Sequence, residues 1–243
     1  MLKEIKGEIQ QWIGALLMKP EERENWRYST GADNAIDIEE RIMFSLLPKS
    51  NRSRLLDVGC GVGTISLELQ KRGFEVYGID FSSVAVEKAK EKGINAIVCD
   101  VDKDGLPFDD GYFDVVWAGD VVEHVFDPMF LFEEMSRVLK PIGKVLLTAP
   151  NDLNIFRRTY IFITGKSPQS NIYRKLRQCK HHTMFSLELL KYMLNEARLS
   201  PRLIGSVLQR PFSDRKYYSR SKILGLLFGI VFIVDAHKFE SDL

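Results

Sequence analysis

A chain of 243 residues, 45% hydrophobic and 28% charged, is long enough to bury a full core and has the composition of a globular protein. The apolar run at residues 223–234 is shorter than the roughly 20 residues that a membrane-spanning helix needs. The charged start, residues 1–20, does not fit a signal peptide. Cys60, Cys99 and Cys179 form no Cys-x-x-Cys pair, so we expect free thiols in a reducing cytoplasm.

The net charge of +1 conceals an uneven distribution. Residues 1–152 carry a net charge of −9, whereas residues 153–243 carry +10. Seven basic residues and no acidic residue lie between Leu153 and Leu187. Such a block is either a solvated face or a site for an anionic molecule or surface, and both interpretations stay open.

The first 50 residues predict two helices that form an N-terminal helical cap over the rest of the chain. Apolar residues at helical spacing cover residues 5–17, and this segment ends at Pro20. A second helix is predicted at residues 36–47, before Pro48. The first helix could lie on a membrane surface, although core packing is the commoner use of such an apolar stripe.

From residue 54 onward, strands and helices alternate. Strands are predicted at residues 54–58, 75–80, 94–99, 113–119 and 143–149, with helices at 63–72, 82–92 and 127–139. The alternation predicts a mostly parallel sheet with helices on both faces. Further along, the pattern predicts a helix at 186–197 with Ser186 as N-cap, a strand at 201–209, a short helix at 221–228 and a strand at 230–237.

These patterns predict a single domain with four parts. We expect a cap at residues 1–50 and a cofactor-binding core at 51–150. Residues 151–185, which lack clear strand periodicity through most of their length, are expected to cover the substrate. Residues 186–243 would form a C-terminal helix and a strand hairpin.

The first predicted strand runs into a turn with glycines at alternate positions, Gly59, Gly61 and Gly63. Glycine adopts dihedrals that side chains disfavour and lets a ligand approach the bare backbone. The N–H groups at the start of the following helix then face that ligand. The spacing Gly-x-Gly-x-Gly differs from the Gly-x-Gly-x-x-Gly fingerprint of dinucleotide-binding proteins. Asp57, two positions before the first glycine, would repel a pyrophosphate but suits a ligand with an ammonium group. A tight turn without a ligand is the alternative.

This turn resembles motif I of the class I S-adenosylmethionine-dependent methyltransferases. Residues 113–125, 139–151 and 181–190 are similar to later segments of the same superfamily. The likeness is strongest to the small-molecule branch that includes the ubiquinone-biosynthesis O-methyltransferases. The resemblance implies a Rossmann-like α/β fold with a seven-stranded sheet of order 3-2-1-4-5-7-6, in which the last strand is antiparallel. It also implies S-adenosylmethionine as cofactor and S-adenosylhomocysteine as product.

Acidic residues end three successive predicted strands, where α/β sheets bind their ligands. We expect Asp80 to accept hydrogen bonds from both ribose hydroxyls, Phe81 to lie beside the adenine, and Asp100 to accept from the adenine amino group. The full expected cofactor-binding set is Asp57, Gly59, Cys60, Gly61, Gly63, Asp80, Phe81, Asp100, Val101 and Asp120.

Methyl transfer to a hydroxyl group requires alignment of the two reactants and removal of one proton. Asp120, Glu123 and His124 are spaced i, i+3, i+4, so they would share one face of a helical turn after the fourth strand. His124 and Glu123 are the predicted catalytic residues, with His124 as general base. Ubiquinone-type enzymes can hold a divalent cation such as Mg²⁺ at the corresponding residues, but Asp120 replaces the more usual glutamate. A metal site and a purely structural role stay open.

The histidine pair His181 and His182 resembles a family position near the acceptor. Either residue could touch the substrate, although a structural role before the helix at residue 186 is an equal alternative.

The sequence therefore predicts a methyltransferase that acts on an oxygen of a small or amphiphilic acceptor. A carbon or nitrogen methyltransferase and a non-catalytic cofactor-binding protein are the alternatives, and a nicotinamide dehydrogenase is disfavoured. Aromatic residues interleave with Arg157 and Arg158 after the fifth strand, which predicts an anionic, lipid-like acceptor or peripheral contact with an anionic membrane. We expect no nucleic-acid partner, because no Asn-Pro-Pro-Tyr-type motif follows the fourth strand and residues 1–152 are acidic.

Overall fold

The computed structural model describes residue 25 and residues 36–165, 182–209 and 216–239. The helix predicted at residues 5–17 lies outside these ranges, as do His181 and Cys179. The descriptions below refer to the described residues only.

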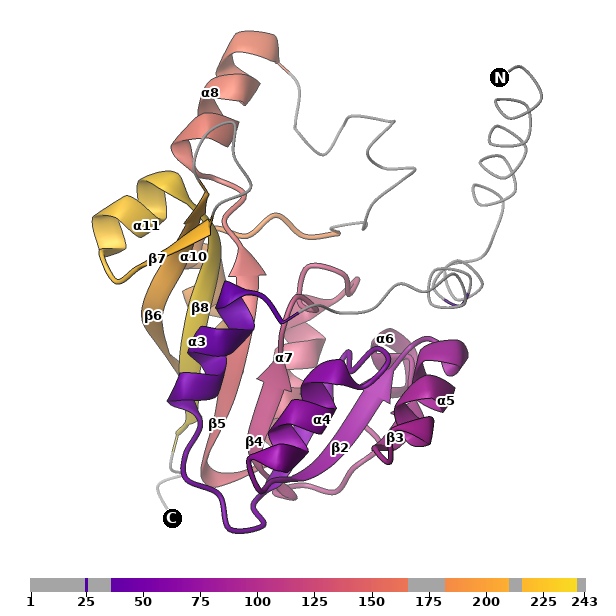
Figure 1. The fold of residues 1–243 in the computed structure, drawn as a ribbon. Helices are drawn as coiled ribbons and strands as arrows, with labels where there is room; N and C mark the ends of the chain where they lie inside the picture. The colour runs from indigo at the N-terminus through magenta and orange to yellow at the C-terminus, as the bar shows by residue number, and fades with distance from the viewer. Residues whose placement is uncertain (1–24, 26–35, 166–181, 210–215, 240–243) are drawn as a thin grey trace, which may run out of the picture.

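One sheet organises the described chain (Figure 1). Its eight strands follow the order β3-β2-β1-β4-β5-β8-β6-β7. Their bounds are β1 (Arg54–Val58), β2 (Glu75–Asp80), β3 (Asn95–Val98), β4 (Phe113–Ala118), β5 (Leu139–Pro150), β6 (Leu199–Gln209), β7 (Lys216–Ser219) and β8 (Gly229–Lys238). Strands β1 to β5 pair in parallel, whereas β8 is antiparallel to both β5 and β6.

This topology confirms the predicted order, with the last strand inserted antiparallel beside the fifth. The predicted number of strands was too small, because β7 adds an eighth at the edge of the sheet. β7 has only four residues and no alternation of apolar and polar side chains, so its sequence carries no strand signal. Its pairing with β6 makes it a strand.

Helices cover both faces of the sheet, as predicted. Their bounds are α3 (Ile38–Leu46), α4 (Thr64–Lys71), α5 (Ser83–Glu91), α6 (Val101–Asp104), α7 (Pro128–Val138), α8 (Ile155–Thr164), α10 (Leu187–Glu196) and α11 (Lys222–Phe228). Helices α3 and α4 pack on one face, and α7 and α10 pack on the other. The Ser186 hydroxyl caps α10 by accepting from the Leu189 N–H at 3.0 Å, as predicted.

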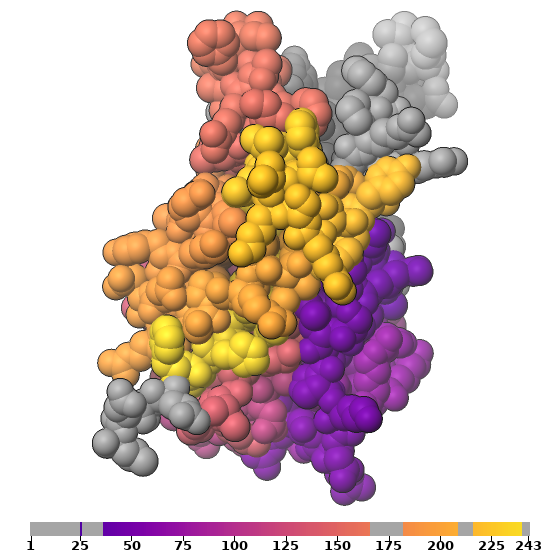
Figure 2. Space-filling model, turned by 90° about the vertical axis from the view of Figure 1, so that its left-hand side faces the viewer, coloured from indigo at the N-terminus to yellow at the C-terminus, as the bar shows by residue number. Residues whose placement is uncertain are grey.

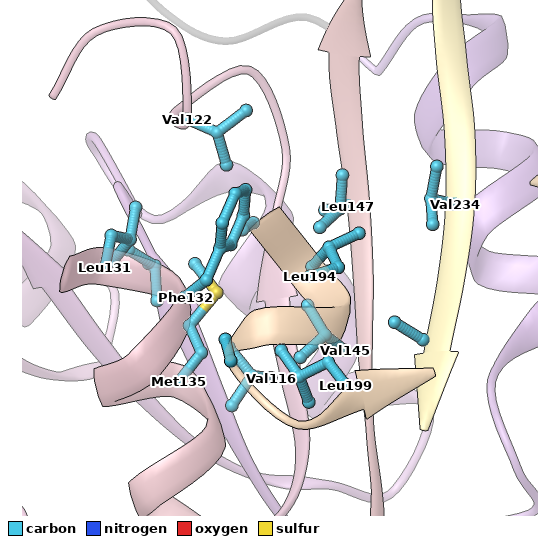
Figure 3. Close-up of a cluster of buried hydrophobic side chains, with 14 of the residues drawn as sticks. Val116, Val122, Leu131, Phe132, Met135, Val145, Leu147, Leu194, Leu199 and Val234 are labelled. Atoms are coloured by element: carbon cyan, nitrogen blue, oxygen red, sulfur yellow. The ribbon is translucent and has the colours of Figure 1, made fainter. Parts of the chain in front are cut away.

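Successive side chains of a strand point to opposite faces of the sheet, so the core has two layers, one on each face. In β4, Val116 and Ala118 belong to the layer under α7 and α10, whereas Val115 and Trp117 belong to the layer under α3 and α4. Figure 3 shows the first layer, where α7 and Leu194 of α10 meet strand side chains. Each fully buried Leu, Val or Phe contributes about 1.5–3 kcal/mol, so these layers supply most of the stability that fixes the strand ends.

Residues 36–47 confirm the second predicted helix, now α3. Phe44 stacks on Trp117 with ring centroids 5.0 Å apart, so α3 lies against the face of the sheet. Residue 25 is the described part of the earlier segment. The Asn25 side chain accepts from the Ser82 hydroxyl at 2.6 Å and from the Val84 N–H at 3.2 Å, which puts it at the start of α5.

Two helices were not predicted, α6 and α8. α6 has only four residues, and α8 lies within the segment that was expected to cover the substrate. Among the described residues, no helix combines the length and the apolar character that crossing a bilayer would require.

Candidate functional site

The glycine turn lies at the carboxyl end of β1 and has the backbone that its sequence predicted. Gly59, Gly61 and Gly63 have φ values of +71°, +53° and +77°, in the left-handed region that favours glycine. A Cβ atom on Gly59 would come within 2.5 Å of the Val121 side chain. The turn after β4 therefore lies directly against the glycine turn, and both are part of one site.

Asp80 joins the end of β2 to this turn. One of its carboxylate oxygens accepts from the Gly61 N–H at 2.8 Å, and the other accepts from the Ser82 N–H at 2.8 Å. The predicted contacts with ribose hydroxyls are compatible with this geometry.

Asp57 is buried beneath the glycine turn. The Ser66 hydroxyl on α4 donates to its carboxylate at 2.5 Å, which links β1 to the first turns of the helix. The pKa of Asp57 is raised to about 7, mainly by burial and in smaller part by the nearby Asp80 charge, while the Ser66 hydrogen bond opposes the rise. Cys60 is also buried, and its side chain packs against Gly78, where a Cβ atom would come within 2.8 Å of the sulfur. These two side chains support the turn from inside the protein.

The end of β3 leads into α6, where Asp100 is the N-cap residue and Val101 begins the helix. Asp100 pairs with Lys103, and Phe81 is half-buried at the end of β2. Sequence reasoning missed Asp102. Its carboxylate accepts from the Phe126 N–H at 2.9 Å and from the Asp127 N–H at 3.1 Å, which ties α6 to the loop after β4.

The residues after β4 form a tight turn and not the helical turn that was predicted. The His124 N–H donates to the Val121 carbonyl at 2.8 Å, and Asp120 has a φ of +53°. The Thr148 hydroxyl on β5 accepts from the Asp120 N–H at 2.8 Å and donates to its carboxylate at 2.9 Å. Because these bonds hold Asp120 in a left-handed conformation, the i, i+3, i+4 spacing does not put the three side chains on a helix face.

Glu123 and His124 nevertheless lie side by side. The Glu123 side chain is only 4% exposed, and its carboxylate oxygen lies 4.0 Å from His124 Nε2. Burial raises the pKa of Glu123 to about 8, with a smaller contribution from the Asp120 charge. The His124 side chain is 33% exposed. A partly accessible imidazole thus borders a buried carboxyl group that holds a proton near neutral pH.

His182 approaches the same turn from the segment before α10. Its N–H donates to the Glu123 carbonyl at 2.7 Å, and its ring stacks on Phe126 with centroids 4.0 Å apart. The structure therefore brings one member of the predicted histidine pair to the predicted catalytic residues.

Glu40 on α3 is a second site residue that sequence reasoning missed. Its pKa is raised to about 7, mainly by burial and in smaller part by the Asp120 charge. Its carboxylate accepts from the Asp37 N–H at 2.8 Å, so locally it is part of the N-terminal cap of α3. No local sequence signal reveals its proximity to Asp120, which is 80 positions away in the chain.

Arg157, which was predicted to meet an anionic acceptor, has a partner within the chain. It forms an ion pair with the buried Asp152, which also accepts from the Phe185 N–H at 3.2 Å. Arg158 donates through Nε to the Leu153 carbonyl at 2.6 Å. Asp152 stands one position before the segment without acidic residues, so inspection of that segment alone missed the pairing.

The described residues contain no group of three or more His, Cys, Asp or Glu side chains that could hold a metal ion. An open recess of about 540 Å³ lies beside β2 and β3, lined by residues that include Tyr77, Asn95 and Tyr112. It adjoins the amino end of β3, away from the strand ends that carry the predicted residues, so we do not take it as the candidate site.

Part of the chain is similar in sequence to known methyltransferases. Residues 56–147 match the model of a methyltransferase domain family. The chain is 32% identical over 145 residues to the chloroplastic "Probable tocopherol O-methyltransferase" of Oryza sativa subsp. japonica, an alignment that covers 50% of this chain and 40% of that protein. It is 29% identical over 188 residues to the ubiquinone biosynthesis O-methyltransferase of Xanthomonas oryzae, covering 73% and 76% of the two chains.

The fold has counterparts among solved structures. A crystal structure from Thermotoga maritima, described as a methyltransferase dependent on S-adenosylmethionine and a possible histamine N-methyltransferase, superposes with a TM-score of 0.62 at 20% identity. The superposition covers 83% of this chain and 88% of that one. At this identity the likeness shows the fold alone.

Proposed function

We propose that the chain is a class I S-adenosylmethionine-dependent methyltransferase and that it methylates an oxygen atom of a small, partly apolar acceptor. The observation that carries the proposal is the buried Glu123 carboxyl group beside the partly exposed His124. Both lie on the turn after β4, next to the glycine turn. The tocopherol and ubiquinone O-methyltransferase names of two relatives support an oxygen acceptor.

The residues of the described site fit the cofactor. Bound S-adenosylmethionine supplies a methyl group on a positively charged sulfur. The bare backbone of Gly59 and Gly61 leaves room for close approach, and the Asp80 carboxylate lies at the adjoining strand end, bonded to the Gly61 N–H of the same turn. Phe81, Asp100, Val101 and Asp120 complete the proposed binding edge, while the buried Asp57 and Cys60 side chains support it from below.

His124 is the proposed general base. Its imidazole would take the proton that the acceptor hydroxyl loses as the O–C bond forms and the methyl–sulfur bond breaks, which leaves S-adenosylhomocysteine as the product. The cation that results would lie 4.0 Å from the Glu123 carboxylate, whose ionised form it favours. Glu123 thus positions His124 and balances its charge.

A second candidate is N-methylation of an amine. Two buried carboxyl groups, Glu40 and Glu123, flank Asp120, and this local excess of acidic groups suits a cationic acceptor better than an anionic one. A C-methyltransferase, a divalent cation and a cofactor-binding protein without catalysis remain alternatives that no contact in the described residues favours.

We also propose that the domain is divided as its sequence predicted, with a core at residues 51–150, a substrate-covering segment at 151–185 and a C-terminal part at 186–243. The contact of Asn25 with the start of α5 supports a cap, within residues 1–50, that reaches the carboxyl edge of β2.

Transfer from radiolabelled S-adenosylmethionine to a catechol, a quinol and a primary amine tests the proposal. We expect labelled O-methyl product from the phenolic acceptors, unchanged by a chelator. Activity that a chelator abolishes and Mg²⁺ restores would select the metal-assisted reaction. Labelled amine alone would select the second candidate, and binding of the cofactor without transfer to any acceptor would contradict catalysis.

A further inference from the structure

Helices α8 and α11 lie at one end of the described chain (Figures 1 and 2). They carry many exposed apolar side chains. α8 buries none of its ten residues, although six of them are aromatic or aliphatic. Phe162 is 90% exposed and Ile163 is 74% exposed, while Ile223 on α11 is 71% exposed. The exposed apolar set, which we call the α8–α11 surface, is Ile155, Phe156, Tyr160, Phe162, Ile163, Ile223, Leu224, Leu227 and Phe228.

This surface is held in place by specific contacts. Asn151, one residue beyond β5, donates through its side-chain amide to the Gly225 and Leu226 carbonyls, both at 3.1 Å. Asn154 caps α8 by accepting from the Arg157 N–H at 3.1 Å. The two helices meet where the Phe156 and Phe228 rings lie 5.9 Å apart. The apolar side chains are therefore presented by two anchored helices.

The two segments that carry the surface contribute charges of one sign. Residues 153–165 and 216–228 contain no acidic residue. Arg158, Arg220 and Lys222 are exposed there. Lys216 is instead engaged by Asp37 and Glu39 on α3. An apolar centre with basic residues around it matches the chemistry of an anionic lipid surface, where apolar groups enter the acyl boundary and basic groups meet the headgroups.

We propose that the α8–α11 surface docks the protein on an anionic lipid membrane. A second copy of the chain is a poorer occupant, because two such surfaces would bring like charges together. In the chain, α8 and the Asn151 anchor follow directly after β5, the strand whose Thr148 holds Asp120 near its carboxyl end. Docking there would bring the site to a lipid-like acceptor, a consequence that rests on the proposed function.

Flotation of the full chain with vesicles tests the docking without any activity measurement. We expect binding to vesicles of phosphatidylcholine and phosphatidylglycerol in equal amounts, and much weaker binding to phosphatidylcholine alone. Phe162→Glu with Ile223→Glu should reduce partitioning at least about tenfold, because two apolar side chains would no longer enter the lipid. Arg220→Gln with Lys222→Gln should reduce it about fivefold per residue.

Ile142→Glu is the matched control, because Ile142 is as exposed as Ile223, at 71%, but lies near the start of β5, away from this surface. Its binding should equal that of the wild type. No flotation of the wild type, or an equal loss in the control, would overturn the proposal. So would concentration-dependent dimerisation that Phe162→Glu abolishes without vesicle binding. Calorimetry with S-adenosylhomocysteine keeps the two proposals separate, since failure to dock would leave cofactor binding intact.

Discussion

Asp80 gives the sharpest prediction at the level of single residues. Asp80→Ala should weaken S-adenosylmethionine binding by about 2–3 kcal/mol, or about 30–150-fold, because charge-assisted hydrogen bonds to the ribose are lost. Asp114→Ala is the matched control: Asp114 also accepts a backbone N–H, from Arg54 at 2.9 Å, but at the amino end of β4. Isothermal calorimetry on both variants makes the comparison, and equal affinities for the cofactor would contradict the role of Asp80.

His124→Ala should lower kcat by about 10²–10⁴-fold while cofactor affinity stays nearly unchanged, because a general base acts in the transition state. His237→Ala is the control, since His237 is an exposed histidine that lies near Asp235 on β8. Steady-state kinetics with the best acceptor measures both variants. Full activity of His124→Ala would leave His124 with a structural role only.

Glu123 should make stability depend on pH. Its pKa is about 8 in the folded protein and 4.5 ordinarily, so between these values the folded protein holds a proton that the unfolded chain has released. Its contribution to stability therefore falls as the pH rises from about 4.5 to 8, with a slope of up to about 1.4 kcal/mol per pH unit. Glu123→Gln should remove this slope.

Chemical denaturation of the Glu123→Gln variant at a series of pH values is the measurement. The exposed Glu133 on α7 provides the control, Glu133→Gln, which should keep the wild-type slope. Parallel curves for wild type and Glu123→Gln would mean that Glu123 ionises in the folded protein as it does in the unfolded chain.

At the level of elements, the pairing of α11 with β6 depends on the absence of one side chain. A Cβ atom on Gly225 would overlap the Ser206 side chain. Gly225→Ala should therefore destabilise the protein by about 1–3 kcal/mol through overpacking. Ser206→Ala should recover part of that loss, because it removes the hydroxyl that the new methyl group meets. Urea denaturation of the single and double variants tests this, and additive losses would contradict the steric account.

The helices and strands that were predicted well are those whose pattern of apolar residues matches the side chains that they bury. Strands β1 and β2 have the predicted bounds, because buried apolar residues are followed by a glycine turn or an acidic strand end. Helix α8 escaped prediction because it buries nothing, and is held by Asn154 and by the Arg157–Asp152 ion pair. Short segments such as α6 and β7 depend on partners distant in sequence.

In the candidate site, too, the features that depend on local sequence were predicted, whereas those that depend on distant contacts were not. The glycine turn has the predicted backbone, since glycine spacing and left-handed φ values are local properties. Glu40 and Asp102 could not be found, because their roles come from Asp120 and from the loop after β4, which are far away in the chain. The turn after β4 was mistaken for a helical turn because the two hydrogen bonds between Thr148 and Asp120 cannot be read from either segment alone.

At the scale of the whole molecule, cofactor binding should stabilise the folded protein, because the proposed binding residues lie at the ends of several strands. Residues proposed to bind it follow β1, β2, β3 and β4, so a ligand that contacts them stabilises the folded protein over the unfolded chain. S-adenosylhomocysteine at a hundred times its Kd should add about 2.7 kcal/mol. A thermal shift assay should show a higher Tm with S-adenosylhomocysteine and no change with NAD. An equal shift with NAD would contradict the proposed cofactor edge.

The position of β8 has a consequence for the newly made chain. β8 fills the middle of the sheet between β5 and β6, yet the ribosome makes residues 229–238 after every other strand. Until they emerge, β5 has an open edge and the β6–β7 hairpin has no sheet to join. Open strand edges are sites of association between chains. The nascent protein therefore passes through a stage, ended only by its last strand, in which contact with another chain competes with its own completion.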